Sequence, residues 1–188
     1  MKLKDLEEVV EKNIVRLFTV FYENPAIFIT ESDVKSYLYS LLINDPFIKN
    51  STPHFKNRYL RKESKTFIVH TEIPEEIKSK KVYDLLIFKP TKLIDLDCCG
   101  TTIAVEIKFN RREPARKEKS SIVEDIKKAK HNRIGYVLWL NWDRPIDDTN
   151  LKTVKMLVDR CRNVKLFYLD VFSEPPKTNL EELLKNAN

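Results

Sequence analysis

Glycine is scarce in this chain of 188 residues, because only Gly100 and Gly135 occur. The P-loop and the GxGxxG turn need several glycines close together to approach a phosphate, so the sequence excludes both. The histidines are scattered without an HExxH motif, and neither GxSxG nor CxxC is present. Zinc hydrolysis and Ser-His-Asp chemistry therefore have no support in the sequence. Carboxylates and lysines remain as the groups that can carry chemistry.

Cysteine is also rare, with Cys98, Cys99 and Cys161 as its only instances. An odd number that includes an adjacent pair does not suit a disulfide framework, which favours a reducing compartment. No apolar run approaches the length of a membrane span. Acidic residues interrupt the first residues where a signal peptide would be apolar, so we expect no signal peptide and a cytoplasmic protein.

Apolar periodicity predicts alternating helices and strands. The spacing predicts an amphipathic helix over 3–22, and a capping box from Thr30 to Asp33 begins a second helix that runs to about Ile43. The polar, basic segment 44–65 is expected to be irregular. Five strands follow, with helices over 117–131 and 149–162 and a short polar helix after 178; the strands are expected at 66–73, 82–88, 101–109, 135–142 and 164–172.

This order of elements predicts an α/β fold with a mixed five-stranded sheet flanked by helices. The first three strands would form a meander, and the later strand-helix-strand unit would make a parallel crossover. We expect a single domain over 1–188, with an N-terminal helical extension at 1–25, a core at 30–142 and a C-terminal extension at 143–188.

Three charged residues interrupt the most apolar strands. Asp84 lies in VYDLLIF, and Glu106 and Lys108 lie in IAVEIKF. A buried carboxylate is unfavourable unless a cation or hydrogen bonds compensate it, so this placement marks a candidate site. Strand alternation places Glu106 and Lys108 on one face and Asp84 on a face with Val82 and Leu86. If the two strands pair, their register brings Asp84 beside Glu106.

Two neighbouring carboxylates would repel each other and would need a hard divalent cation. Oxygen ligands favour Mg²⁺ or Mn²⁺ over zinc. Lys108 is then placed to hold an attacking water or a phosphate oxygen. The alternative is an ordinary salt bridge on a solvated edge strand, in which Lys108 pairs with Glu106 or Asp84.

Asp84 followed by the EIK triplet at 106–108 resembles the PD-(D/E)xK nuclease superfamily, which includes restriction endonucleases and archaeal Holliday-junction resolvases. The resemblance implies a restriction-endonuclease-like αβββαβ core, although Tyr83 stands where the family has proline. It implies that Asp84 and Glu106 hold the metal, that the Ile107 carbonyl adds a ligand and that Lys108 assists the nucleophilic water.

Acids and a lysine on two helices complete this implied site. Glu31 is the expected fourth metal ligand, with Asp33 as its rival, and Glu31 can also be read as a helix-start acid. The helix after the EIK triplet supplies the accessory candidates Asp125 and Lys128, for which plain surface charge is the simpler interpretation.

The implied function is Mg²⁺- or Mn²⁺-dependent hydrolysis of DNA, duplex or branched, by an endonuclease. The resemblance also allows a homodimer with the helix at 3–22 as its interface. The alternatives are an inactive nuclease-like module that binds nucleic acid or protein, and an RNA-processing nuclease.

Basic clusters suit a nucleic-acid partner, since the chain carries a net charge of +6. The residues expected to contact the nucleic acid are Arg111, Arg112, Arg116, Lys117 and Lys119, with a second cluster of Arg58, Arg61 and Lys62 near Phe55 and Tyr59. An ordinary solvated loop is the alternative for the basic run 111–119.

Overall fold

The larger of two sheets is mixed and has the strand order β3-β4-β6-β7-β8-β9. A computed structural model describes residues 2–51, 54–57, 62–65, 68–74, 82–88, 94–95, 103–109, 115–143 and 145–179. Its strands are β3 (Val69–Pro74), β4 (Val82–Ile87), β6 (Ile103–Phe109), β7 (Ile134–Asn141), β8 (Val164–Asp170) and β9 (Lys177–Thr178).

Strand directions in this sheet follow the predicted pattern. The pairs β3–β4 and β4–β6 are antiparallel, which confirms the meander. The pairs β6–β7 and β7–β8 are parallel, which confirms the crossover. The two-residue strand β9 joins β8 antiparallel and adds a sixth strand that the sequence did not indicate.

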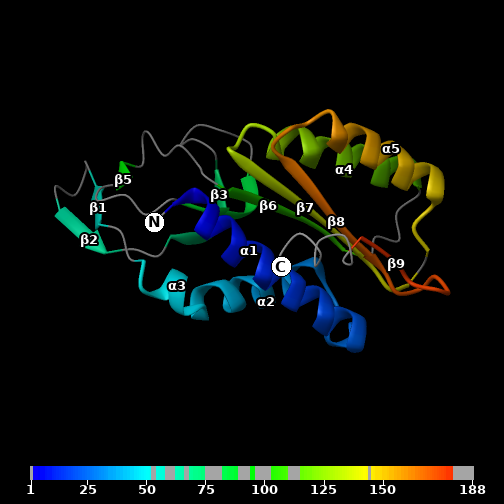
Figure 1. The fold of residues 1–188 in the computed structure, drawn as a ribbon, viewed down its shortest axis with the longest axis horizontal. Helices are drawn as coiled ribbons and strands as arrows, with labels where there is room; N and C mark the ends of the chain where they lie inside the picture. Colours follow the sequence, from blue (N-terminus) through cyan, green and yellow to red (C-terminus); the bar gives the residue numbers. More distant parts are fainter. Residues whose placement is uncertain are drawn as a thin grey trace.

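Helices cover both faces of the sheet. Figure 1 shows α1 and α2 on one face and α4 and α5 on the other; their bounds are α1 (Leu3–Glu23), α2 (Glu31–Asn44), α4 (Ala115–Ala129) and α5 (Asp148–Asp159). The short helices η1 (Pro25–Ile27) and α3 (Pro46–Lys49) flank α2. The predicted α/β architecture is therefore confirmed, with α2, β3, β4, β6, α4 and β7 following the expected αβββαβ order.

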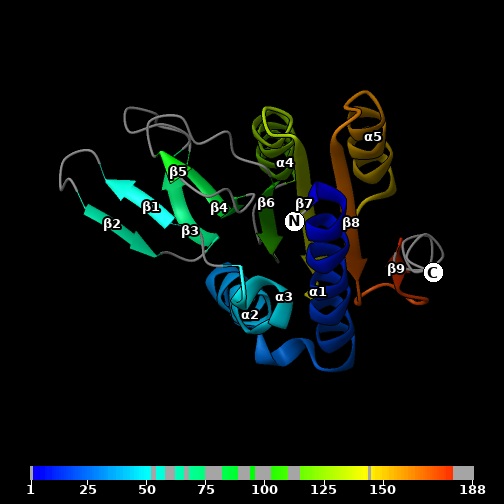
Figure 2. The same cartoon turned by 60° about the vertical axis from the view of Figure 1, so that its left-hand side comes forward.

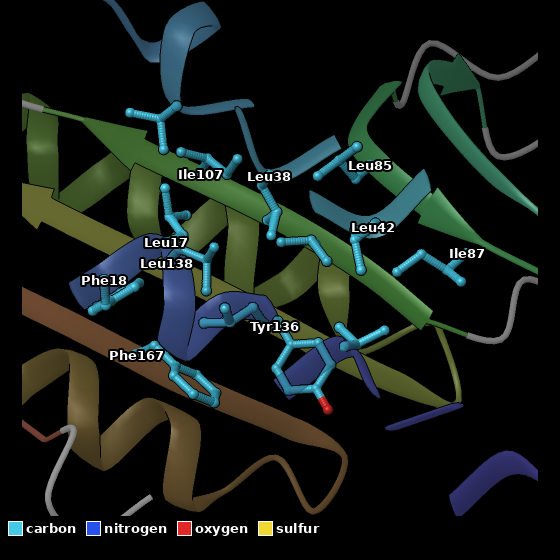
Figure 3. Close-up of a cluster of buried hydrophobic side chains, with 14 of the residues drawn as sticks. Leu17, Phe18, Leu38, Leu42, Leu85, Ile87, Ile107, Tyr136, Leu138 and Phe167 are labelled. Atoms are coloured by element: carbon cyan, nitrogen blue, oxygen red, sulfur yellow. The ribbon is translucent and has the colours of Figure 1, made fainter. Parts of the chain in front are cut away.

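The first helix is part of the main core. Its periodic apolar residues are fully buried: Leu6, Val10, Ile14, Leu17, Phe18 and Phe21. Figure 3 shows Leu17 and Phe18 among sheet residues such as Leu138 and Phe167, and the rings of Phe18 and Phe167 meet edge to face at 6.2 Å. Because this apolar face is already buried within the chain, α1 has no such face left for the homodimer interface that the sequence suggested.

The capping box that begins α2 is present as predicted. Oγ1 of Thr30 accepts the Asp33 N–H at 3.2 Å, and Oδ2 of Asp33 accepts the N–H groups of Thr30 at 2.7 Å and Ile29 at 3.0 Å. The box satisfies free N–H groups of the first turn and thereby fixes where Glu31, the first helical residue, lies.

A second, three-stranded sheet has the order β2-β1-β5, from β1 (His54–Asn57), β2 (Lys62–Lys65) and β5 (Ile94–Asp95). Figures 1 and 2 place it on the β3 side of the large sheet. The expectation that 44–65 is irregular was therefore wrong, since α3, β1 and β2 lie there. The sequences HFKN and KESK of β1 and β2 lack the apolar alternation from which a strand is recognised.

Within the part of the chain that the structure describes, no helix is both long enough and apolar enough to cross a membrane. The short closing helix expected after 178 falls mostly outside the described residues.

Candidate active site

Strand β6 separates apolar from charged side chains as the sequence predicted. Ile103, Val105, Ile107 and Phe109 belong to the core under α1 and α2. Glu106 and Lys108 lie on the opposite face, where α4 covers them. The side chain of Glu106 is only 1% exposed and that of Lys108 12% exposed. The alternative of a salt bridge on a solvated face is therefore wrong.

The β3–β4 ladder is interrupted at the residue that carries the first predicted carboxylate. Register pairs run from Val69↔Ile87 to Pro74↔Val82, but the pair Glu72↔Asp84 is missing. Glu72 has a φ of 52°, in the left-handed region that a glutamate rarely adopts. The irregularity places Tyr83 in a buried cluster with Leu86.

This break changes the face on which Asp84 lies. Tyr83 donates its hydroxyl proton to the Lys128 carbonyl on α4, whereas Oδ1 of the adjacent Asp84 lies 3.9 Å from Lys35 Nζ on α2. The prediction that Asp84 shares a face with Val82 and Leu86 was therefore wrong. Tyr83 and Leu86 are three residues apart yet share one buried cluster, so simple alternation fails along this part of β4, although the register is the same on both sides of the missing pair.

Asp84 lies at the point where β4 and β6 stop pairing. The last register pair toward this end is Leu85↔Val105, so an unbroken ladder would next have placed Asp84 opposite Glu106. Instead, Oδ2 of Asp84 accepts the main-chain N–H of Ile107 at 2.8 Å. The N–H and C=O of one strand residue point toward the same neighbouring strand, so the Ile107 carbonyl points into this gap too.

Glu106 is the most deeply buried acid of the site. Its Oε2 accepts a hydrogen bond from Lys128 Nζ at 2.7 Å. Its Oε1 is buried and has no hydrogen-bond partner among the described residues. Burial, and then the negative charge of Asp84, raise the pKa of Glu106 to about 8, although the Lys128 ammonium opposes the rise. The Lys128 ammonium therefore compensates the buried carboxylate only in part.

Lys108 and Asp125 form a second ion pair. Lys108 Nζ lies 3.0 Å from Oδ2 of Asp125 on α4. Burial raises the pKa of Asp125 to about 6 against the effect of the Lys108 ammonium. Burial alone would lower the pKa of Lys108, but the charges of Asp125 and Glu31 outweigh it and raise that pKa. Lys108 is therefore a protonated ammonium at neutral pH.

Lys128 connects α4 to both strands of the site. Besides Glu106, its Nζ donates to the Val82 carbonyl at 2.6 Å and lies 5.3 Å from the centre of the Tyr83 ring. The interpretation of Asp125 and Lys128 as plain surface charges was wrong, because both are paired with strand residues of the site. Both residues lie in VEDIKKAK, and their spacing of three residues places them on the same face of the helix. The packing of α4 in the structure was needed to show that this face is turned to the sheet.

The two acids at the start of α2 have different roles. The carboxylate of Asp33 accepts the capping hydrogen bonds. These bonds, above all the one from the Thr30 main chain, lower the pKa of Asp33. Glu31 lies near enough for its charge to raise the pKa of Lys108. Of the two candidates for a ligand on this helix, Glu31 is therefore the one directed at the site.

Lys35 and Glu72 belong to the same neighbourhood, and the sequence analysis missed both. Lys35 lies one helical turn after Glu31, and its Nζ is 2.5 Å from Oε1 of Glu72. Glu72 lies in a strand-like run, TFIVHTEI, so the rule that singled out Asp84 and Glu106 would also have found it. Lys35 carried no comparable signal, because a lysine on a helix is ordinary.

The donor set fits a hard divalent cation. Asp84 and Glu106 are close enough for their charges to interact, and the buried Oε1 of Glu106 has no hydrogen-bond partner in the described part of the chain. The candidate ligands Asp84, Glu106, Glu31 and the Ile107 carbonyl all offer oxygen, which suits Mg²⁺, Mn²⁺ or Ca²⁺. Within the described ranges, no three acidic, histidine or cysteine side chains form a ready metal-binding group. There, Lys128 lies close to Glu106 and Lys35 lies close to Asp84.

The predicted nucleic-acid contacts are outside what the structure describes. Arg58, Arg61, Arg111 and Arg112 lie beyond the described residues. Lys62 lies on β2, and Arg116, Lys117 and Lys119 lie on the first turns of α4, so only their main-chain positions are known. In the sequence, these α4 residues follow the strand that carries Lys108, and their contact with nucleic acid stays a prediction.

Comparison with known proteins adds little. No family model matches the chain, and no curated protein matches it significantly. Among solved structures, the chain is similar to Pyrococcus furiosus SfsA, determined in complex with Ca²⁺, with 15% sequence identity and a TM-score of 0.38. The match covers 74% of this chain and 57% of the SfsA chain, so this chain spans little more than half of that protein.

Proposed function

We propose that this protein is a divalent-metal-dependent nuclease that hydrolyses DNA phosphodiester bonds as an endonuclease, with Mg²⁺ or Mn²⁺ as its cofactor. One observation carries the proposal. One oxygen of the buried Glu106 carboxyl has no hydrogen-bond partner among the residues that the structure describes, the negative charge of Asp84 acts on this carboxyl, and Glu106 lies on the same strand face as the protonated Lys108. The negative charge of this cluster of residues is not fully balanced, and a bound cation would balance it.

Asp84 and Glu106 would hold the cation, and the Ile107 carbonyl and Glu31 are the further ligand candidates. A divalent ion supplies Lewis-acid stabilisation for the phosphate oxygens and for an attacking water. The protein positions these ligands rigidly, because Asp84 is fixed by the Ile107 N–H and Glu106 by Lys128.

Lys108 acts as a positive group rather than as a base, since its pKa is raised. Its ammonium donates hydrogen bonds to the attacking water or to a phosphate oxygen, where negative charge develops. The water oxygen forms a bond to phosphorus while the bond from phosphorus to the leaving sugar oxygen breaks. The proton lost by the water passes to solvent, and the leaving oxygen takes up a proton. Asp125 holds Lys108 in place through their 3.0 Å contact.

The decisive experiment measures cleavage of labelled duplex, branched and RNA substrates with Mg²⁺, with Mn²⁺ and with chelator. We expect metal-dependent cleavage of DNA, and a loss of at least about 10²-fold in Lys108→Ala and Asp84→Asn. Lys127→Ala is the control, because Lys127 is an exposed lysine of the same helix as Lys128. Circular dichroism verifies that each variant is folded. Cleavage that persists in both site variants would defeat the proposal, and cleavage of RNA alone would favour RNA processing.

A second candidate is a nuclease-like module that binds nucleic acid or protein without cutting. The observation in its favour is that lysines already approach both candidate ligands, with Lys128 on Glu106 and Lys35 near Asp84. Titration with Mn²⁺ separates the two candidates. A nuclease is expected to bind the ion and gain thermal stability, whereas a pure binding module is expected to show neither effect.

A further inference from the structure

Glu72 and Asp84, the pair missing from the β3–β4 ladder, each have a carboxylate oxygen near Lys35 on α2. In a regular strand, Glu72 would share a face with His70, whose ring lies 5.4 Å from that of Phe88 in the cluster on the α4 side. Glu72 instead reaches Lys35 on α2, and its left-handed φ of 52° makes this possible. A strained glutamate in this position is typical of a functional constraint.

Lys35 lies between the two acids but is bonded to one of them. Its Nζ is 2.5 Å from Oε1 of Glu72 and 3.9 Å from Oδ1 of Asp84. The contact with Glu72 is a charge-assisted hydrogen bond, whereas the separation from Asp84 is too long for a hydrogen bond. This contact also lowers the pKa of Glu72, so the glutamate stays ionised. The ammonium therefore has a preferred partner other than the candidate metal ligand.

The position of Lys35 matters because an ammonium and a divalent cation compete for the same carboxylate oxygen. Oδ2 of Asp84 already accepts the Ile107 N–H, which leaves Oδ1, the oxygen 3.9 Å from Lys35 Nζ, as the one that a cation can take. A lysine that hydrogen-bonded to Oδ1 would occupy it and would add a repelling charge beside the metal site.

We propose that Glu72 holds the Lys35 ammonium away from Asp84 and so keeps Oδ1 of Asp84 available to a divalent cation. This inference rests on the proposed metal site. Glu72 is a positioning residue that acts through Lys35 rather than a ligand. It follows that the loss of Glu72 should harm metal binding only while Lys35 is present.

The test is a two-residue cycle with Mn²⁺ affinity as the readout, measured on the full chain without nucleic acid by electron paramagnetic resonance of free Mn²⁺. Glu72→Met removes the acceptor, and Lys35 is expected to move onto Asp84 and weaken Mn²⁺ binding about tenfold. Lys35→Met should bind Mn²⁺ as well as the unmodified chain or more tightly. The double variant should recover affinity to within about threefold of the unmodified chain.

Each other result overturns the inference. Unchanged affinity in Glu72→Met shows that Lys35 is not restrained by Glu72. An equally weak double variant shows that Glu72 acts directly. Weaker binding in Lys35→Met shows that the lysine supports the site. If Glu72→Met does not fold, Glu72→Gln replaces it, with a smaller loss expected because the amide oxygen still accepts a hydrogen bond.

Two controls separate this inference from the proposed metal site. Asp148 and Lys177 form an exposed pair at 2.6 Å, and Asp148→Asn should leave Mn²⁺ affinity unchanged. A metal-free crystal structure of Glu72→Met should place Lys35 Nζ within about 3 Å of Asp84 Oδ1. A lysine that stays away from Asp84 in that crystal defeats the inference. Absence of Mn²⁺ binding by the unmodified chain defeats the proposed metal site instead.

Discussion

Nζ of Lys128 lies 2.7 Å from Oε2 of Glu106, and this ammonium is the main influence that opposes the raised pKa of the glutamate. Removing it in Lys128→Met should raise the pKa of Glu106 above its present value of about 8. Carbon-13 NMR of the glutamate carboxyl groups measures the shift in metal-free protein. Lys127→Met, an exposed neighbour, is the control and should leave the titration unchanged. A pKa of Glu106 that falls in Lys128→Met would contradict the ion pair.

Glu106 should make folding stability depend on pH. Its pKa is raised by folding from the ordinary 4.5 to about 8, so the folded state holds a proton that the unfolded state loses within this range. The contribution to stability is present in full below pH 4.5 and is lost as the pH rises to about 8.

Urea unfolding of Glu106→Gln at acid, neutral and mildly alkaline pH measures this contribution. The variant should lose less stability with rising pH than the unmodified chain, by more than about 1 kcal/mol. Glu124→Gln is the matched control, because Glu124 is exposed on α4. Parallel pH curves for the unmodified chain and Glu106→Gln would show that the carboxyl is ionised without penalty.

Gly135 permits the close approach of β7 to the end of α4. A Cβ at this position would lie 2.7 Å from both the Cβ and the carbonyl oxygen of Ala129. Because one of these atoms belongs to the main chain, Gly135→Ala should displace α4 and destabilise the fold by roughly 1–3 kcal/mol. The midpoint of thermal or urea unfolding measures the change. An unfolding midpoint equal to that of the unmodified chain would show that α4 packs less tightly here than the structure describes.

Asp170 stabilises the turn that follows β8. Its carboxylate accepts hydrogen bonds from the N–H of Ile146 at 2.7 Å, the N–H of Phe172 at 3.0 Å and the N–H and hydroxyl of Ser173 at 3.2 and 2.7 Å. Asp170→Ala would leave the buried Ile146 N–H and the partly buried donors of Phe172 and Ser173 unpaired and should reduce the free energy of unfolding by about 2–4 kcal/mol. Asp159→Ala, at an exposed position near the end of α5, is the control and should change it by less than about 0.5 kcal/mol.

The sequence predicted the large sheet well because its strands are apolar and therefore recognisable. The run IAVEIKF gave the correct faces for Glu106 and Lys108, since β6 keeps a regular register with β7 from Ile103 to Phe109. The run VYDLLIF gave the strand but not the direction of Asp84. That direction depends on Glu72 in another strand, and alternation along a single strand cannot predict it.

The polar partners of the site were harder to predict than its acids. Asp84 and Glu106 were conspicuous because they interrupt apolar strands, whereas Lys35, Asp125 and Lys128 belong to helices in which charge is ordinary. Their roles depend on which helical face packs against the sheet, a property of tertiary structure. The small sheet of β1, β2 and β5 escaped prediction for a related reason, since its strands carry no apolar pattern.

The edge-to-face contact between Phe18 and Phe167 joins one of the earliest helices of the chain to one of its last strands. During synthesis, the helix emerges from the ribosome long before the strand that it will cover. Its apolar stripe therefore stays uncovered by this strand, or is shielded by a chaperone, until β8 has been synthesised.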